Sequence, residues 1–291
     1  MRIDLHTHSS VSDGTDSPAE LVVAAAAAGL DVVALCDHDT FDGLDEAVAA
    51  GPGVGVRVLR GLEMSAQHQW DSVHVLGYGC RADDPALAAE LARVREGRNG
   101  RVPAMLANLA RYGLPVPAEV LERQVGASPS VGRPHIADAM VELGYVADRR
   151  EAFDTWLADD RPIFVGRYAS PLRKALDLIQ GAGGVAVIAH PWGRGRREQL
   201  PASLLEGFAD AGRLDGIEVD HQDHDEATRA DLRALAHRLG LLATGSSDYH
   251  GLGKTDHGLG CNTTGDEVLA EIESRVAERG GRLTGPDAAS V

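Results

Sequence analysis

The stretch Asp4-Leu5-His6-Thr7-His8-Ser9-Ser10-Val11-Ser12-Asp13 occupies positions 4–13 of this 291-residue chain. A short run ending at Leu5 is typical of a β-strand, and His6 and His8 at its end point to the same side of an extended backbone. Asp13 follows in a loop rich in Ser and Gly that can fold back towards them. Imidazoles combined with a carboxylate suit Zn, Mn or Fe rather than Ca or Mg. An isolated pair of histidines also occurs in structural roles, so the metal interpretation requires further ligands elsewhere in the chain.

Further candidate ligands lie at the ends of other predicted strands. Seven segments have strand patterns: a run ending at Leu5 and residues 31–36, 56–62, 72–77, 184–189, 214–219 and 241–245. Most are followed by a helical pattern, and nearly every one ends at His, Asp or Glu. In a parallel (β/α) barrel the carboxyl ends of the strands meet on one face, where the active site is built. The pattern therefore predicts an α/β fold of the barrel type, with these polar side chains gathered on one face.

A change of character between residues 84 and 168 predicts a helical insertion. Strand patterns stop there, and short helical patterns follow one another at residues 85–96, 102–112, 117–124, 134–143 and 149–157. The barrel is accordingly expected to comprise residues 1–83 and 169–280. The last residues, 281–291, are Gly-rich and polar, and a frayed tail is expected there.

Composition restricts the partners of the chain. A formal charge of −16 argues against stable binding of long nucleic acid, although bound metal would reverse the sign locally and admit a nucleotide or a short oligoribonucleotide. The three cysteines Cys36, Cys80 and Cys261 lie far apart, which favours reduced thiols. No signal peptide or membrane span is visible, so we expect a cytoplasmic protein without a membrane partner.

In combination, the motifs of the chain resemble those of the PHP (polymerase and histidinol phosphatase) family of metal-dependent phosphoesterases. The matching motifs are Asp4-Leu5-His6-Thr7-His8-Ser9, Ser12-Asp13-Gly14, Asp37-His38-Asp39, Gly61-Leu62-Glu63-Met64-Ser65, Val73-His74-Val75-Leu76-Gly77-Tyr78, Ala189-His190-Pro191 and Ser246-Ser247-Asp248-Tyr249-His250. One departure is Cys36, where Thr is commoner, and it is expected to lie behind the ligands. The resemblance implies a distorted seven-stranded (β/α) barrel of the PHP type that holds three divalent metal ions, with Mn, Fe and Zn all compatible.

The resemblance also implies which residues hold each ion. The first ion would be bound by His6, His8, Glu63 and Asp248, the second by Asp13, His38 and His250, and the third by Glu63, His74 and His190. Glu63 would bridge two ions, and Glu63, Asp248 and His190 are the predicted catalytic residues. Asp37 and Asp39, which flank His38, are expected to orient ligands or cap helices.

The insertion narrows the resemblance to one branch of the family. Val131-Gly132-Arg133-Pro134-His135-Ile136-Ala137 is similar to the branch with nucleoside 3′,5′-bisphosphate phosphatases and enzymes that trim RNA from its 5′ end. There the insertion would cover the substrate. Arg133 and His135, at a predicted helix start, are assigned to the substrate's 5′-phosphate. His224 is a further candidate for substrate contact, and a structural role fits it equally well.

The predicted function is hydrolysis of the 3′-phosphate of a nucleoside 3′,5′-bisphosphate by a hydroxide that bridges metal ions. Release of nucleotides from short RNA in the 5′-to-3′ direction uses the same geometry and stays open, as does a histidinol-phosphate type of reaction. The alternative from another class is a nucleotide- or metal-binding module without catalytic activity.

Overall fold

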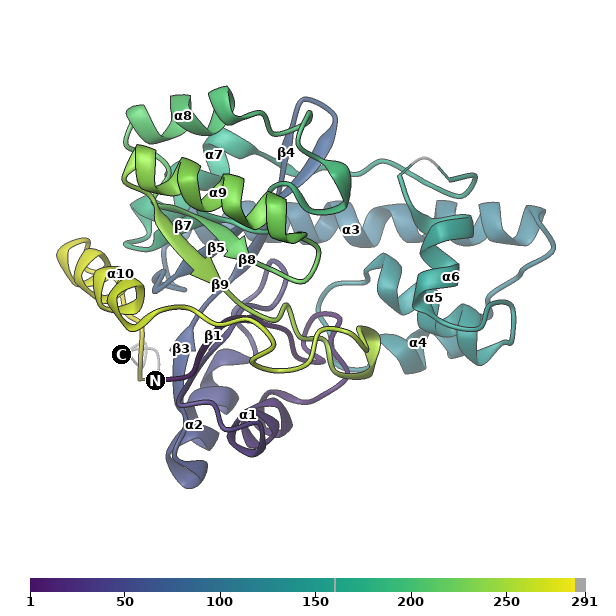
Figure 1. Cartoon of the computed structure of the whole chain (residues 1–291). Helices are drawn as coiled ribbons and strands as arrows, with labels where there is room; N and C mark the ends of the chain where they lie inside the picture. The colour runs from purple at the N-terminus through teal and green to yellow at the C-terminus, as the bar shows by residue number, and fades with distance from the viewer. Residues whose placement is uncertain (160, 286–291) are drawn as a thin grey trace.

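The computed structural model describes residues 1–159 and 161–285, and it shows an α/β protein with two sheets (Figure 1). The first sheet is parallel, in the order β1-β2-β3, with β1 at Ile3–Thr7, β2 at Val32–Leu35 and β3 at Arg57–Arg60. Helices α1 (Pro18–Ala27) and α2 (Leu44–Val54) connect these strands. Helix α1 begins at a capping box, in which Ser17 accepts the backbone N–H of Glu20 and Glu20 accepts that of Ser17.

The second sheet is mixed and has six strands in the order β6-β4-β5-β7-β8-β9. Their bounds are β4 Glu63–His68, β5 Asp71–Tyr78, β6 Ser170–Pro171, β7 Val185–Ile188, β8 Gly216–Asp220 and β9 Leu242–Gly245. Strands β4 and β5 form an antiparallel hairpin, and β5 is also antiparallel to β7, whereas the other pairs are parallel. Two short bridges, Thr7–Tyr249 and His38–Glu63, link the two sheets at one end of the strands.

This arrangement agrees with the predicted α/β class and differs in detail from the predicted barrel. The ladders among the described residues form two sheets rather than one closed seven-stranded sheet. The predicted strand at residues 56–62 ends early, at Arg60, and the chain turns at Gly61 into β4. A Cβ atom at Gly61 would lie 2.4 Å from Cys36 Sγ and 2.7 Å from the Leu35 carbonyl oxygen, so only glycine fits this close approach. Glu63 therefore begins β4 instead of following β3.

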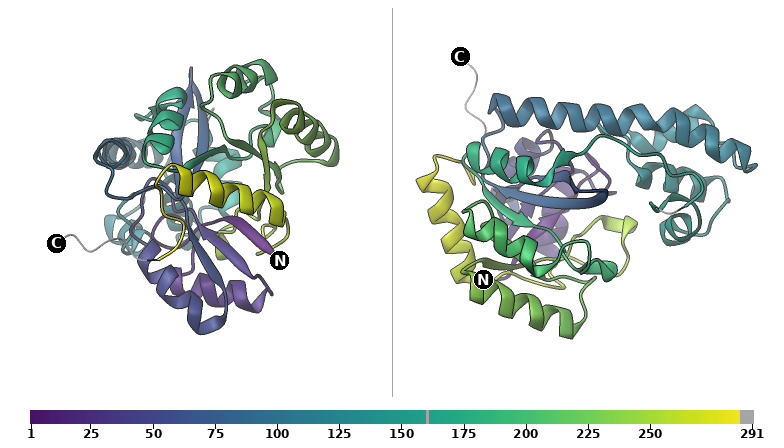
Figure 2. Two further views of the ribbon diagram at one scale, coloured as in Figure 1. Left: turned by 90° about the vertical axis from the view of Figure 1, so that its left-hand side faces the viewer. Right: turned by 90° about the horizontal axis from the view of Figure 1, so that it is seen from above.

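Four helices cover the second sheet and complete the fold (Figure 2). They are α7 (Leu172–Gly181), α8 (Ala202–Asp210), α9 (Glu226–Leu239) and α10 (Asp266–Glu278). Both faces of the sheets are buried in apolar clusters, which explains why most strands read as continuous apolar runs. Of the predicted frayed tail, residues 281–285 are held to the sheet by Arg282 N–H donating to Gly79 and Arg60 N–H donating to Leu283, and residues 286–291 lie outside the described part. No helix among the described residues is long and apolar enough to cross a membrane.

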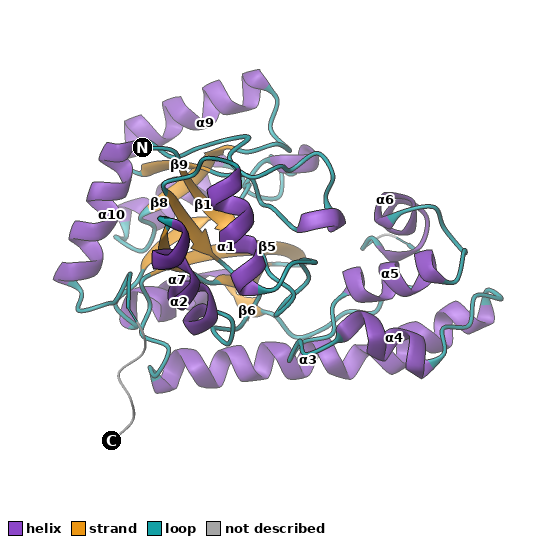
Figure 3. Ribbon diagram, turned by 90° about the horizontal axis from the view of Figure 1, so that it is seen from below, coloured by secondary structure: helices purple, strands orange, loops and turns teal. Residues whose placement is uncertain are grey.

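Residues 84–168 form a group of helices beside the sheets (Figure 3). They are α3 (Pro85–Arg111), α4 (Ala118–Val125), α5 (Arg133–Glu142) and α6 (Arg149–Ala152), with a π-helical turn at Phe153–Leu157. The two helices expected at residues 85–96 and 102–112 are one continuous helix, α3, with Pro103 inside it. Packing outweighs the local cost of proline here, because Val102 and Met105, on either side of Pro103, are buried in an apolar cluster. Gly97 on the same helix lets the backbone of Tyr168 approach, because a Cβ atom there would lie 3.1 Å from the Tyr168 carbonyl oxygen. The group has an apolar core of its own around Met105, Ile136 and Met140.

Candidate metal centre

The end of β1 supplies the first two candidate ligands. Ile3 and Leu5 are fully buried in the apolar core, whereas His6 and His8 are fully buried on the opposite side of the strand. The Nε2 atoms of the two histidines lie 3.0 Å apart, as expected for side chains on one side of an extended backbone. The apolar residues therefore fix the strand in the core and direct both imidazoles towards the same space.

Glu63 lies at the centre of the site. Five imidazole nitrogens surround its carboxylate, at 3.4 Å (His6 Nε2), 3.1 Å (His8 Nε2) and 3.0 Å (His38 Nδ1) from Oε2 and at 2.9 Å (His74 Nδ1) and 3.4 Å (His190 Nε2) from Oε1. Neither carboxylate oxygen, nor Nδ1 of His38, makes a hydrogen bond of acceptable geometry with the described residues. Burying a carboxylate without hydrogen bonds destabilises the folded state. The two oxygens of Glu63 and Nδ1 of His38 are therefore suited to act as metal ligands, with a cation on each side of the carboxylate.

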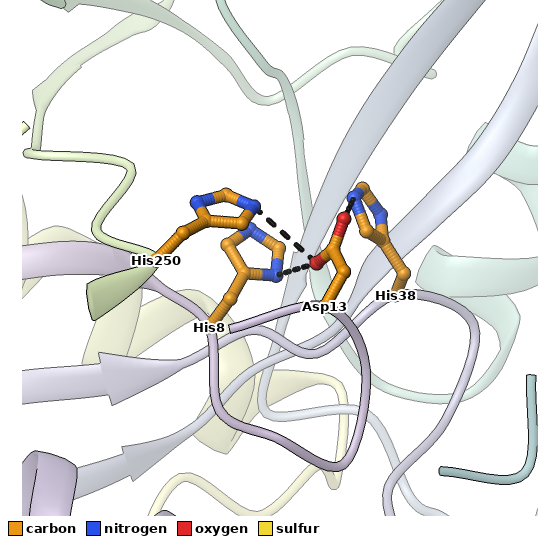
Figure 4. A group of neighbouring side chains, drawn as sticks. All are labelled: His8, Asp13, His38 and His250. Atoms are coloured by element: carbon orange, nitrogen blue, oxygen red, sulfur yellow. Dashed lines mark ion pairs between the residues drawn. The ribbon is translucent and has the colours of Figure 1, made fainter. Parts of the chain in front are cut away.

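A second group of ligand atoms gathers around Asp13 (Figure 4). Asp13 Oδ1 lies 3.3 Å from His250 Nε2 and 3.9 Å from His8 Nδ1, and Oδ2 lies 3.6 Å from His38 Nε2. His250 donates its Nδ1–H to the Asp248 carbonyl oxygen at 2.8 Å, which leaves the Nε2 lone pair directed at the group. The loop predicted to fold back towards the histidines does so, and it brings Asp13 into contact with residues more than 200 positions away.

Asp248 joins the site from the end of β9. Its Oδ1 atom lies 3.5 Å from His6 Nε2 and 3.4 Å from His8 Nε2, whereas its Oδ2 atom is bound by Lys254 and, at 3.3 Å, by His221 Nε2. The backbone at Asp248 has φ 55°, a left-handed conformation that is uncommon for a residue other than glycine and typical of functional sites. One oxygen of Asp248 thus faces the candidate ligands while the other is held in place by donors.

His221, Asp248 and His257 also lie close enough together to form a metal-binding group. The tautomer of His221 argues against that role. The Asp223 N–H donates to His221 Nδ1 at 3.0 Å, so the ring proton is on Nε2 and is donated to Asp248. His221 therefore acts as a donor that orients Asp248, a role that the sequence alone did not reveal.

Three buried carboxylates hold the ligands and their loops in place. Glu218 Oε1 lies 3.2 Å from His6 Nδ1, and Glu218 Oε2 accepts the backbone N–H of His190 at 2.8 Å. Asp37 accepts the backbone N–H and hydroxyl of Ser9, at 2.8 and 2.6 Å, and thereby fixes the loop that carries Asp13. Asp39 similarly accepts from the backbone and hydroxyl of Ser65 and from Arg98. Among these contacts, that of Glu218 with His6 Nδ1 gives a candidate ligand histidine a partner for its other nitrogen. Asp37 and Asp39 instead fix the backbone around Ser9 and Ser65.

The electrostatics of the centre favour cation binding. Burial alone would raise the pKa of Glu63 and Asp13, but electrostatic interactions and hydrogen bonds with the surrounding histidines outweigh it and hold both pKa values well below the usual range. Burial lowers the pKa of His74 and His250 to about 3, so these imidazoles are neutral. Burial would also lower the pKa of His8, yet hydrogen bonds to Asp248 and Glu63 raise it to about 9. Without a bound cation, the ionised carboxylates are therefore partly neutralised by protons on histidine, which metal ions would displace.

The structure brings all nine predicted ligands together. The three predicted substrate contacts, in contrast, are hydrogen-bonded to other parts of the chain. Arg133, the first residue of α5, donates to the Leu157 carbonyl oxygen at 2.9 Å and to Asp159 at 2.5 Å. His135 accepts the Gly132 N–H on Nδ1 at 2.9 Å, and its ring also bonds to the Ser12 backbone. His224 is buried, with Nδ1 at 2.9 Å from the Val219 carbonyl oxygen and Nε2 without a partner among the described residues.

A small cavity connects the centre to the helical group. It is lined by Ser12, Asp13, His38, Arg98, Ser130, Gly132 and His135. Two of these residues, Asp13 and His38, are candidate ligands, whereas Arg98, Ser130, Gly132 and His135 come from residues 84–168. The ligand cluster on the strands and the helical group therefore line one site.

The chain has extensive similarity to known phosphoester hydrolases. Residues 4–115 match the family model described as the PHP domain. The chain is 37% identical to a 3′,5′-nucleoside bisphosphate phosphatase of Chromobacterium violaceum, with 89% of this chain and 90% of the relative covered. It is 32% identical to a 5′-3′ exoribonuclease of Haemophilus influenzae, with 86% of this chain and 90% of the relative covered. A solved structure from Bifidobacterium adolescentis, assigned as a metal-dependent phosphoesterase, superimposes with a TM-score of 0.89 at 35% identity and covers 94% of this chain and 96% of that chain.

Proposed function

The chain belongs to the PHP family, whose members named above are hydrolases of phosphoric esters, and we propose that it removes the 3′-phosphate of a nucleoside 3′,5′-bisphosphate. The observation that carries this proposal is the shared site: the carboxylate and imidazole cluster around Glu63 opens onto a cavity lined by Arg98 and Ser130 of the helical group. Cations bound by the cluster would bind one phosphate of a doubly phosphorylated substrate. The Arg98 guanidinium and the Ser130 hydroxyl would bind the other phosphate. A substrate with a phosphate at each end matches both parts.

We propose three divalent cations, Mn, Fe or Zn, held by the ligand sets that the family resemblance implies. His6, His8, Glu63 and Asp248 form the first set, Asp13, His38 and His250 the second, and Glu63, His74 and His190 the third. When bound, such ions supply a water molecule of lowered pKa and neutralise charge on phosphoryl oxygens. Among the proposed catalytic residues, Glu63 holds the cluster together, Asp248 is fixed by His221 and Lys254, and His190 is positioned through its N–H by Glu218.

We propose that residues 84–168 act as a cap on a distorted PHP-type barrel made by residues 1–83 and 169–280. The bridges Thr7–Tyr249 and His38–Glu63, which join the two sheets beside the cluster, support the barrel arrangement. Arg133 and His135 at the start of α5 are proposed to serve the 5′-phosphate, because the N-terminus of a helix favours an anion. To bind phosphate, Arg133 would have to release Asp159. His135 would have to release one of its two backbone hydrogen-bond partners. His224 remains a proposed substrate contact because its buried Nε2 is free to accept a hydrogen bond.

Exonucleolytic trimming of short RNA is the second candidate, and the similarity to the Haemophilus influenzae exoribonuclease favours it. Both reactions break the ester at the 3′ oxygen of a nucleotide that carries a 5′-phosphate. The two substrates differ only in what else is bonded to the reacting phosphate. In the bisphosphate this phosphate is a terminal monoester, whereas in RNA it is also esterified to the next nucleoside.

A substrate panel tests the proposal. Metal-free protein would be reloaded separately with Mn, Fe or Zn and assayed for release of phosphate or nucleotide. The substrates are adenosine 3′,5′-bisphosphate, 3′-AMP, 5′-AMP, histidinol phosphate and a 5′-phosphorylated trinucleotide. We expect the highest kcat/KM with the bisphosphate. Faster cleavage of the trinucleotide or of histidinol phosphate would replace the proposed substrate, and tight binding without turnover of any member would identify a binding module.

A further inference from the structure

An arginine of the helical group reaches the loop that carries Asp13. Arg149, the first residue of α6, donates from Nη1 to the Asp13 carbonyl oxygen at 3.0 Å, across 136 positions of the sequence. We propose that Arg149 is a positioning residue, which acts through the backbone of Asp13 to hold the Asp13 carboxylate in the second metal-ligand set. This inference rests on the proposed function in one respect, the assignment of Asp13 as a ligand.

The guanidinium group of Arg149 has little freedom to move. Its Nε atom donates to Asp138 Oδ1 and its Nη2 atom donates to Asp138 Oδ2, both at 2.6 Å. Two parallel hydrogen bonds of this kind hold a planar guanidinium group against a carboxylate in one orientation. The Arg149 side chain is also largely buried, with 14% of it exposed. Asp138, on α5, therefore directs the remaining nitrogen, Nη1, at the loop of Asp13.

The peptide group that joins Asp13 to Gly14 is held at both ends. Its N–H, that of Gly14, donates to the Ser9 carbonyl oxygen at 2.9 Å within the loop. Its carbonyl oxygen, that of Asp13, accepts from Arg149, which is its one donor among the residues that the structure describes. Because a peptide group is planar, fixing both of its ends fixes the backbone on the carboxyl side of Asp13. Loss of Arg149 would free this peptide group to rotate and would loosen the position of the Asp13 carboxylate.

The loop on either side of Asp13 is anchored to the sheets rather than to the helical group. The Ser12 hydroxyl donates to Asp37 Oδ1 at 2.6 Å, and Asp37 follows β2. The Thr15 N–H donates to the His250 carbonyl oxygen at 3.2 Å, and His250 follows β9. These contacts do not involve Arg149, so the loop as a whole should keep its fold when Arg149 is replaced. The expected effect is a local displacement of Asp13.

The guanidinium group of Arg149 also contacts the segment that follows His250. A Cβ atom at Gly253 would lie 2.7 Å from Arg149 Cζ, which is closer than a side chain can approach. Gly253 does not have a positive φ, so the space that Arg149 occupies, rather than the backbone conformation, requires glycine here. Arg149 therefore contacts the chain at or beside two of the three residues in the second ligand set, Asp13 and His250.

The alternative is that Arg149 and Asp138 form an ion pair that only joins α5 to α6. Removing such a pair would lower the melting temperature and leave the affinity for metal unchanged. A positioning role predicts the reverse: the affinity for one ion falls, while the metal-free protein melts close to the wild type. Metal binding, read without turnover, therefore separates the two roles.

Two substitutions test the positioning role in different ways. Arg149→Gln shortens the side chain and removes its charge, so it cannot reach Asp13. Gly253→Ala keeps every charge and instead displaces the guanidinium group, because the new Cβ atom takes the space of the Arg149 side chain. Arg150→Gln and Gly258→Ala are the matched controls. Arg150 is exposed beside Arg149 on α6, and a Cβ atom at Gly258 has no neighbour within 4 Å in the described part of the chain.

The readout is Mn binding to metal-free protein, measured by chelator competition, with the retained ions counted by elemental analysis. We expect Arg149→Gln and Gly253→Ala each to weaken the binding of one ion by about 10- to 100-fold, with the other ions and both controls unchanged. Turnover of the bisphosphate should fall in parallel at limiting Mn and recover at saturating Mn. Gly253→Ala should add nothing to Arg149→Gln in the double variant, because both act through one contact.

Unchanged affinity for every ion in Arg149→Gln and Gly253→Ala overturns the inference. Equal weakening of all ions together with a lower melting temperature also overturns it, because that result indicates a general effect on the fold. If Arg149→Gln misfolds, Gly253→Ala decides alone, since it removes no hydrogen-bonding group. If Mn binding depends on Arg149 but the wild type does not hydrolyse the bisphosphate, the proposed function fails and the positioning role stands. Hydrolysis by the wild type with Mn binding independent of Arg149 has the opposite meaning.

Discussion

Replacing Glu63 by glutamine is the sharpest perturbation of the proposed centre. The side chain keeps its size, so the register of β4 with β5 and the surrounding core are preserved. The charge is lost at the point where the ring nitrogens of five histidines converge within 3.4 Å of the two carboxylate oxygens. An amide can offer one oxygen to one cation and turns an N–H₂ group towards the other, so both sides of the centre are affected.

The size of the effect can be worked out from electrostatics. Two unit charges about 4 Å apart in a medium with an effective dielectric constant of about 20 interact with about 4 kcal/mol. That energy corresponds to roughly a thousandfold in affinity. Reorganisation of neighbouring histidines will offset part of it, because His6 and His8 are each attracted to Glu63 and lose protons more readily without its charge. We therefore expect affinity for two of the ions to fall by at least about a hundredfold.

Chelator competition followed by elemental analysis measures this change directly. Phosphate release from adenosine 3′,5′-bisphosphate provides the second readout, and we expect turnover to fall along with metal occupancy. Glu119→Gln is the matched control, because Glu119 is exposed on α4 and distant in sequence from every candidate ligand. Full metal stoichiometry together with wild-type turnover in Glu63→Gln would refute the bridging assignment.

Four other substitutions probe the remaining parts of the site and the fold. His38→Ala should abolish activity while the metal-free protein melts within a few degrees of the wild type, since His38 lies at a strand end rather than in an apolar cluster; a lost circular dichroism signal would contradict this. Arg133→Ala should raise KM for the bisphosphate by about 10- to 150-fold and leave a substrate without 5′-phosphate unaffected; equal losses would argue against a 5′-phosphate role. His221→Gln should weaken metal binding by about 10- to 100-fold in chelator competition, because Asp248 loses a donor. Asp215→Asn should destabilise the protein by about 1.5–3 kcal/mol in urea at pH 7. Burial alone would raise the pKa of Asp215, but hydrogen bonds, first from Arg279, lower it below the ordinary 3.8. The ionised Asp215 therefore stabilises the folded state above pH 3.8, and this stabilisation is lost as the pH falls through the folded-state pKa. The difference in stability between the wild type and Asp215→Asn should accordingly shrink in acid.

The cluster of candidate metal ligands could be predicted from the sequence because ligand residues at strand ends follow local rules. His6 and His8 alternate with apolar residues that anchor β1 in the core, and the spacing alone indicates that their imidazoles share a side. Asp248 and His250 follow a strand in the same way. No local rule supplies the pairing of strands: the hairpin of β4 and β5 is antiparallel, so His74 reaches Glu63 from the interior of a strand rather than from its end.

The buried arginines of helix α3 were not predicted, because the pattern of a helix does not show which of its faces is covered. Arg98 and Arg101 lie three residues apart on α3, a spacing that places them on one face of the helix but does not say whether that face meets solvent or protein. Charged helix faces are usually solvated, so nothing in the sequence alone marks these two arginines as buried. Both side chains are held by residues distant in sequence: Arg98 donates to Asp39 and Ser65, and Arg101 donates to the Val165 carbonyl oxygen.

The distribution of charge explains how an acidic protein can act on an acidic substrate. Most of the formal charge of −16 is spread over the surface, where it is screened within about 10 Å at moderate ionic strength. The carboxylates of the centre are buried and surrounded by imidazoles, so bound cations would reverse the local sign. Arg98 of α3, which lines the cavity, adds a positive group on the far side of the same cavity, one that does not depend on metal. Phosphate binding should therefore persist in part when the metal is removed, whereas hydrolysis should stop completely; loss of both on chelation would show that Arg98 and the other lining residues do not bind phosphate without metal.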